Sequence, residues 1–364
     1  MEGEKVSCFN PLKAFEIGTL PSGKKELKIV PYGVDHLEMS ANGRIYPVAN
    51  HELSAYRVKS FRKWSEIPCG YCEGCRIARS REWANRCMME LEYHDSAYFV
   101  TLTYDEAHVP HSYYADPDTG EAKESLTLRK RDFQLFMKRL RKAFPEGKIR
   151  YYACGEYGTQ TLRPHYHAII YGLKLDDLKV YRDVNRGDVG YQYFTSQSLQ
   201  DVWSVLESSQ EDNSSVRVPL GYVLVGKVTW ETCAYTARYV MKKHYGAEAA
   251  VYEQFGIEPE FVLMSRRPGI ARQWYDDHPD IYAYDNINLS TAKGGMKIRP
   301  PKYFDKLFDI ENHEMMSEIK EKRKHFAEEG KKAMLSKTSL SYEEVLKVKE
   351  SAFHNRIKAL KREL

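Results

Sequence analysis

Two histidines in an alternating apolar stretch form the pattern in this chain that most clearly suggests chemistry. The stretch 164–173 (PHYHAIIYGL) reads as a β-strand. Side chains two positions apart on a strand point to the same face. His165 and His167 would therefore present two imidazole nitrogens to one divalent ion. Two hydrogen-bonded surface histidines would share this spacing, so the motif alone leaves both interpretations open.

An acidic residue on the preceding strand could complete that site. Glu156 lies near the end of the strand expected at 149–158, nine residues before His165. If the two strands pair, the carboxylate reaches the histidine face as a third ligand. A mixed histidine and carboxylate set suits Mg²⁺ or Mn²⁺, which can act as a Lewis acid on a scissile phosphate. An acid in a surface turn is the alternative.

Two tyrosines one helical turn apart are candidate nucleophiles. Tyr235 and Tyr239 lie in a helix expected at 232–246 (TCAYTARYVMKKHYG), at positions that share one face. A phenol attacks weakly at neutral pH because its ordinary pKa is about 10. A metal-polarised phosphate and an ammonium from Lys242 or Lys243 would assist it. Tyrosines at the core edge of an amphipathic helix are the alternative.

Three cysteines form a second candidate metal site. Of the seven cysteines, Cys69, Cys72 and Cys75 stand in C-G-Y-C-E-G-C, a spacing that lets thiolates converge on one ion. Cys87, or a histidine such as His94, is the expected fourth ligand of a structural Zn²⁺ or, as the alternative, an iron–sulfur cluster. A glycine-rich turn with reduced cysteines would also fit. The odd cysteine count favours a reducing cytoplasm over a disulfide framework.

The elements that must position these residues alternate between strands and helices. Strands are expected at 97–104 and within 216–228, and helices at 76–93 and at 196–206, the latter capped by Ser196. This mixture predicts an α+β fold with an antiparallel sheet flanked by helices. We divide the chain into a β-rich or irregular segment 1–67, a cysteine turn plus helix 68–95, the core 96–250, a connecting segment 251–300 and a charged helical extension 301–364, in which Gly330 and 336–341 separate two helices.

A helix expected at 126–144 carries a strongly basic face opposite an apolar stripe. Such a face contacts DNA phosphates or is simply solvated. Its basic residues are Arg129, Lys130, Arg131, Lys138, Arg139, Arg141 and Lys142.

Composition excludes several classes of protein. The chain has 364 residues, 42% hydrophobic and 29% charged, with a net charge of only +4. It has no apolar run near the ~20 residues that a membrane helix needs, and no apolar signal core at its N-terminus. We therefore expect a globular protein that is neither membrane-bound nor exported, and any polyanion binding must come from local charge.

The motifs occur in an order that resembles the HUH endonucleases that initiate rolling-circle replication. The longer strings GEYGTQTLRPHYHAIIYG, AYTARYVMKKHYG and MSRRPGIARQWY resemble the initiators of gokushovirus-like microviruses, which are single-stranded DNA bacteriophages. The resemblance spans about 68–275 and implies an about five-stranded antiparallel sheet. It also implies that His165, His167 and Glu156 bind the metal, that Tyr235 and Tyr239 are nucleophiles, and that Lys242 or Lys243 assists them.

The family's activity gives the expected function. A tyrosine would nick the viral origin, form a 5′-phosphotyrosine and leave a 3′-hydroxyl primer, and the circular strand would later be rejoined. The expected partners are single-stranded origin DNA and a host helicase and DNA polymerase, in the cytoplasm of the host bacterium. A relaxase- or transposase-type HUH nuclease and a non-catalytic single-stranded DNA-binding or packaging protein are the alternatives. The oligomeric state is left open.

Overall fold

The computed structural model describes residues 8–21, 23–48, 57–158, 160–186, 189–208, 215–238, 246–284, 286–291 and 294–361. These residues form two compact units, and each is described by itself. The larger unit comprises Arg79–Met316, and the smaller unit combines Lys5–Ala78 with Ser317–Leu364.

A seven-stranded antiparallel sheet organises the described part of the larger unit, in the order β12-β13-β16-β7-β11-β10-β17. The α+β class is confirmed, but the sheet has more strands than the five or so expected. Strands β12 and β13 are rich in polar residues and β17 has only four residues, so none of them carries a clear signal in the sequence. The strands are β7 (Ala97–Thr103), β10 (Arg150–Tyr157), β11 (Pro164–Tyr171), β12 (Lys179–Arg186), β13 (Val189–Thr195), β16 (Val223–Lys227) and β17 (Phe261–Met264).

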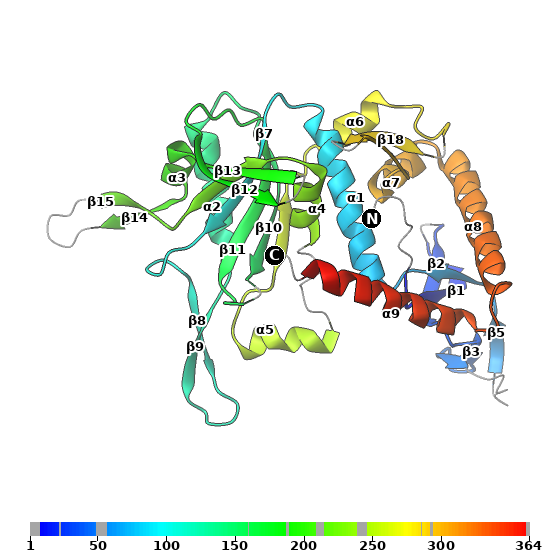
Figure 1. The fold of residues 1–364 in the computed structure, drawn as a ribbon. Coiled ribbons are helices and arrows are strands. Elements are labelled where there is room, and N and C mark those ends of the chain that lie inside the picture. Colours follow the sequence, from blue (N-terminus) through cyan, green and yellow to red (C-terminus); the bar gives the residue numbers. More distant parts are fainter. Residues whose placement is uncertain are drawn as a thin grey trace. The chain divides into compact units, whose positions relative to one another are not determined.

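Each face of the sheet is covered by its own helices (Figure 1). On one face, α2 (Lys130–Ala143) and α3 (Gln197–Val202) pack their apolar side chains against Val100, Tyr166 and Ile170. On the other face, α1 (Glu73–Leu91) and α4 (Trp230–Arg238) pack against Phe99 and Ile169. Alternation along β11 therefore sends odd-numbered residues to the α1/α4 face and even-numbered residues to the α2/α3 face.

Two expected helices differ from the structure. The helix expected at 196–206 is too long, because α3 ends at Val202 and β14 begins at Ser204. The chain leaves the helix at Trp203, which is fully buried and donates a 2.8 Å hydrogen bond from Nε1 to the carbonyl of Thr103. The expected Ser196 cap is present, with its hydroxyl 3.2 Å from the amide of Leu199. Of the helix expected at 232–246, the structure describes α4 as far as Arg238.

The other elements of the larger unit lie around this sheet. Two hairpins extend away from it, β8–β9 and β14–β15 (Figure 1). The bounds are β8 (His111–Ala115), β9 (Ala122–Leu126), β14 (Ser204–Ser208), β15 (Ser215–Pro219), a short 3-10 helix (Gly246–Ala249), α5 (Ala250–Gln254), α6 (Arg272–Asp277), β18 (Ile287–Thr291), β19 (Gly294–Ile298) and α7 (Lys302–Glu311).

The smaller unit contains two three-stranded sheets, in the orders β2-β1-β6 and β4-β3-β5. Phe15, Val30, Leu37 and Phe61 form its buried core. Gly330, expected between two helices, lies within α8, and the break falls at Ser336–Ser341 as expected. The elements are β1 (Leu12–Thr19), β2 (Lys25–Pro31), β3 (His36–Ser40), β4 (Ile45–Val48), β5 (Arg57–Phe61), β6 (Trp64–Ile67), α9 (Tyr342–Lys361) and most of α8 (His313–Leu335).

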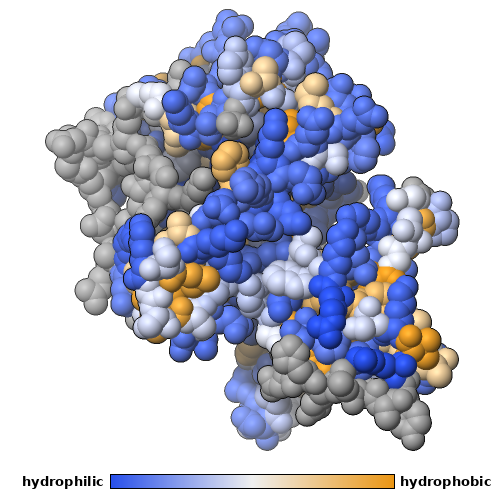
Figure 2. Space-filling model, turned by 90° about the vertical axis from the view of Figure 1, so that its right-hand side faces the viewer, coloured by the Kyte–Doolittle hydropathy of each residue, from blue (hydrophilic) through white to orange (hydrophobic). Residues whose placement is uncertain are grey.

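Hydrophilic residues dominate the surface seen in Figure 2, where hydrophobic residues gather only in small groups. Within the described residues, no helix combines the length and the apolar character needed to span a bilayer.

Candidate active site

The register of three central strands brings the candidate metal ligands together. Glu156 on β10 pairs directly with His165 on β11, so their side chains lie on the same face, which is that of α1 and α4. His167, two residues along, pairs with Thr101 of β7 on its other side. The ligand atoms of Glu156, His165 and His167 all lie within 4.8 Å of one another. The strand pairing that the sequence analysis required is therefore present.

The carboxylate of Glu156 lies between the two imidazoles. Its Oε1 is 2.6 Å from Nε2 of His165 and 3.2 Å from Nε2 of His167. Glu156 is only 1% exposed. Burial raises the pKa of this carboxyl, but the hydrogen bonds and charges of the two histidines outweigh burial and lower the pKa to about 2. Glu156 is therefore an anion across the neutral pH range.

Neighbouring groups orient the imidazoles as metal ligands. Nδ1 of His165 lies 3.0 Å from the carbonyl oxygen of Arg163, which can only accept, so Nδ1 carries the proton. In the neutral ring, Nε2 then directs a lone pair at the Glu156 carboxylate. Two electron-rich atoms 2.6 Å apart require a proton or a cation to hold them together. Nδ1 of His167 lies 3.0 Å from the hydroxyl of Thr101, which leaves its Nε2 toward the same carboxylate. This donor set fits a divalent cation.

Tyr235 packs against this ligand group. The centroids of the Tyr235 and His167 rings are 5.2 Å apart at an interplanar angle of 77°, so the two rings meet edge to face. Phe99 supports both, stacking on His167 at 5.4 Å and meeting the edge of Tyr235 at 6.2 Å. One of the two candidate nucleophiles therefore lies beside the candidate metal ligands.

Helix α4 is fixed in place by α1. The hydroxyl of Ser80 donates a 2.9 Å hydrogen bond to the carbonyl of Ala234, the residue before Tyr235. The indole of Trp230, where α4 begins, donates a 2.8 Å hydrogen bond to the side chain of Asn85. These contacts set the height and rotation of Tyr235 over the sheet. The other predicted catalytic residues lie outside the described residues: Tyr239, Lys242 and Lys243.

The basic helix lies on the opposite side of the sheet from this site. Because α2 packs on Tyr166 and its neighbours, the sheet separates its charged face from Glu156 and the histidines. Arg139 is half-buried and donates a 2.8 Å hydrogen bond to the carbonyl of Val202, so it joins α2 to α3 and is a poor candidate for DNA contact. The other six predicted DNA-binding residues are exposed: Arg129, Lys130, Arg131, Lys138, Arg141 and Lys142.

The residue between the two histidines connects the site to α2. Tyr166 points to the α2 face and is fully buried. Its hydroxyl donates a 2.8 Å hydrogen bond to the carbonyl of Arg129, the residue that caps α2, and lies 3.2 Å from the amide of the same residue. Strand β11 is thus held on both of its faces.

Comparison with known proteins supplies the family. The chain is 30% identical over 342 residues to the replication-associated protein ORF2 of Spiroplasma virus 4, which covers 92% of this chain and 97% of the relative. This chain belongs to the family of microvirus replication-associated proteins. The resemblance inferred from the sequence motifs is therefore confirmed.

Other comparisons agree with this family membership. The family model for the replication-associated protein ORF2 matches residues 97–244, which contain all the predicted ligands and tyrosines of the site. The replication-associated protein VP4 of Bdellovibrio phage phiMH2K is 27% identical over 275 residues, covering 72% of this chain and 75% of the relative. No solved structure is significantly similar to the chain.

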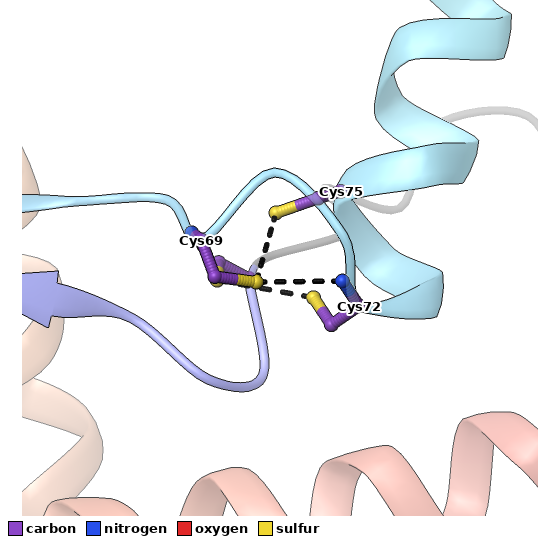
Figure 3. A group of neighbouring side chains, drawn as sticks. Cys69, Cys72 and Cys75 are labelled. Carbon is purple, nitrogen blue, oxygen red and sulfur yellow. Dashed lines mark hydrogen bonds between the residues drawn. The ribbon is translucent and has the colours of Figure 1, made fainter. Parts of the chain in front are cut away.

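The structure changes the expected set of four cysteines. Cys69, Cys72 and Cys75 converge, as Figure 3 shows, and the fourth member of the group is Cys8, with all four sulfurs within 4.8 Å of one another. Cys87 is instead fully buried in the core between α1, α4 and the sheet, with Cys233. It lies twelve residues beyond Cys75 on α1, about 18 Å along the helix, so it cannot join the group. His94 lies near Glu90, 3.1 Å from its carboxylate, and is not a member either.

Sequence reasoning missed the supporting residues of both sites. The Arg163 carbonyl sets the His165 tautomer, and a backbone oxygen carries no sequence signal. Phe99 was visible only as a strand residue. Cys8 stands 61 residues before Cys69, and only the odd cysteine count hinted that it could join the motif.

Proposed function

We propose that this chain is a single-strand DNA endonuclease that starts rolling-circle replication, with Tyr235 as a nucleophile. The observation that carries this proposal is the edge-to-face packing of the Tyr235 ring on His167, at 5.2 Å between centroids. A phenol needs a phosphate held and charge-compensated beside it, and Glu156, His165 and His167 offer a ligand set for that purpose. The family's role in replication supports DNA as the substrate.

Glu156, His165 and His167 are the residues that would hold Mg²⁺ or Mn²⁺, and the ion would supply Lewis-acid stabilisation of charge on the scissile phosphate. The residues of the chain prepare this site. The low pKa of Glu156 keeps its carboxylate ionised, while the Arg163 carbonyl and the Thr101 hydroxyl orient the two imidazoles. Three protein ligands leave positions open for water and a phosphate oxygen.

In the cutting step, the Tyr235 oxygen attacks a DNA phosphorus. The O–P bond forms as the bond from phosphorus to the 3′-oxygen breaks, and the phenol proton passes to solvent or to a nearby base. The products are a 5′-phosphotyrosine and a free 3′-hydroxyl. Rejoining reverses these bonds: a 3′-hydroxyl attacks the phosphotyrosine and the phenol is released. The ester conserves the bond energy, so ligation needs no nucleotide cofactor.

The remaining parts of the scheme rest on sequence. Tyr239 follows Tyr235 by one helical turn and would cut the regenerated junction after one round, and Lys242 or Lys243 would stabilise the phenolate. The free 3′-hydroxyl would prime a host DNA polymerase while a host helicase separates the strands, in the cytoplasm of the bacterial host.

A covalent-adduct assay tests the proposal. The full-length chain is mixed with Mn²⁺ and with labelled single strands that tile the viral genome, and adducts are resolved on denaturing gels. We expect one strand to form an adduct that resists denaturation and is digested by protease. Tyr235→Phe together with Tyr239→Phe should abolish it. Tyr113→Phe, at a tyrosine that is 71% exposed on hairpin β8–β9, is the matched control and should leave it unchanged.

Two outcomes would contradict the proposal. One is that no strand forms an adduct with the folded wild-type protein in Mn²⁺ or Mg²⁺. The other is that the double tyrosine variant forms as much adduct as the wild type. A protein that binds single strands tightly without cutting any of them would indicate the packaging alternative.

A further inference from the structure

We propose that Cys8, Cys69, Cys72 and Cys75 bind one structural zinc ion, which fastens the segment before the first sheet strand to the beginning of α1. The four residues lie in the smaller unit, and their sulfurs converge within 4.8 Å. This inference does not depend on the proposed endonuclease activity, because none of these residues belongs to the Glu156 and histidine group.

The distances between the sulfurs match tetrahedral coordination of a single ion. With a Zn–S bond of about 2.3 Å, the sulfurs of a regular tetrahedron lie about 3.8 Å apart. The Cys8–Cys69, Cys8–Cys72 and Cys69–Cys75 sulfurs are 3.5, 3.8 and 4.0 Å apart. A disulfide would bring two sulfurs to about 2.0 Å. An iron–sulfur cluster would hold them farther apart, since its cysteines bind different iron atoms.

Backbone amides face the sulfurs as they would face thiolates. The amide of Cys69 lies 3.3 Å from the sulfur of Cys8. The amides of Phe9 and Cys72 lie 3.4 Å from the sulfurs of Cys72 and Cys69. N–H groups that point at sulfur stabilise negative charge, and the N-terminus of the 19-residue α1, which follows Cys72, adds to this effect. Four thiolates without a cation would repel one another at these distances.

The surroundings indicate a structural role. Cys8 comes from the segment before β1, and the other three ligands lie in the turn before α1 and in its first helical turn (Figure 3). Phe9 is buried beside Cys72 and packs on Phe353 of α9, with the ring centroids 5.4 Å apart. Four protein ligands leave no open position for a substrate. The ion would therefore join two segments that are distant in the sequence, next to the contact that holds α9.

Metal analysis of the full-length chain tests this inference. After expression with supplemented zinc, we expect mass spectrometry to find one zinc per chain. Cys8→Ser should lose it, whereas Cys8→His, which restores a zinc ligand, should retain most of it. Cys87→Ala is the matched control and should keep one zinc, because Cys87 lies outside the group. The double variant His165→Ala/His167→Ala should also keep one zinc, which separates this result from the fate of the endonuclease proposal.

A second measurement needs no variant that could fail to fold. A mercurial reagent is titrated into the wild-type protein while a chelating dye reports released zinc. We expect one zinc to leave as four thiols are blocked, before the fully buried Cys233 reacts. Folded wild-type protein without zinc, the absorbance of an iron–sulfur cluster, or zinc retained at full occupancy in Cys8→Ser would overturn the inference.

Discussion

Glu156, His165 and His167 stand on neighbouring strands of one sheet, whereas the four cysteines come from a turn, a helix start and a distant N-terminal segment. The first group has three hard or borderline ligands and a tyrosine ring beside it, which suits an ion that must also hold a phosphate. The second has four soft ligands and no nucleophile among them, which suits an ion that only holds the chain together. Ligand number and chemistry thus distinguish a site for reaction from a site for folding.

Removing a ligand of the strand site should have the largest effect. His167→Ala deletes one imidazole and the surface on which Tyr235 packs, so we expect adduct formation in Mn²⁺ to fall at least about 10³-fold. The rate of adduct formation on the cleaved strand measures this effect. His313→Ala, at a histidine whose side chain is 78% exposed, should leave the rate unchanged. A His167→Ala rate close to that of the wild type would remove the distinction between the two sites.

Weakening the support of that ligand should cost less. Thr101→Val keeps the side-chain shape but removes the hydroxyl 3.0 Å from Nδ1 of His167. We expect Mn²⁺ affinity to fall about 10- to 100-fold, because loss of a group that orients a ligand typically has this effect. A Mn²⁺ titration of the adduct rate provides the measurement, and Thr101→Ser should restore the affinity. Equal affinities in Thr101→Val and Thr101→Ser would show that the hydroxyl does not orient the ring.

The buried carboxylate should appear in the pH dependence of stability. The pKa of Glu156 is about 2 in the folded chain, against about 4.3 when unfolded, so its ionised form favours the folded state above the unfolded value. That contribution is lost as the pH falls toward the folded value. The difference in free energy of unfolding between wild type and Glu156→Gln should shrink by roughly 1.5 kcal/mol from about pH 5 to about pH 3. Urea unfolding without divalent ions tests this, and a constant difference would contradict it.

The smallest effect should come from the basic helix. Replacing Lys138, Arg141 and Lys142 with Gln removes three exposed charges on the side of the sheet away from the site. We expect the salt dependence of single-strand binding, as the slope of log affinity against log salt, to fall by about 2. Cutting at saturating DNA should be unaffected. Replacing Lys320, Lys322 and Lys324 on α8 is the charge-matched control, and equal slopes in both variants would indicate that α2 is merely solvated.

Local patterns predicted most of the strand site. Alternation placed His165 and His167 on one face, and the hairpin register then added Glu156. The helix with Tyr235 followed from its composition. The apolar stripe of α2 showed that one side of this helix is buried, but it contains no information on which face of the sheet the helix covers. The sequence therefore could not show that the basic residues lie away from the histidines.

Contacts between distant segments account for the errors. Cys8 joins the motif across 61 residues, and no local spacing rule reaches that far. The helix expected at 196–206 stops early because Trp203 is buried against the sheet and bonds to Thr103, a tertiary contact that overrides local preference. Strands β12 and β13 form a largely polar hairpin at the sheet edge, so an apolar-run criterion missed them.

The anchoring of Tyr166 has a consequence for the economy of catalysis. Because its hydroxyl is tied to the cap of α2, the strand between the two imidazoles cannot easily rotate or slide. The ligands are thus preorganised when the protein folds, and substrate binding need not supply the free energy to align them. A change at the buried end of α2 should therefore alter the rate of bond cleavage from the far side of the sheet, without any contact with DNA.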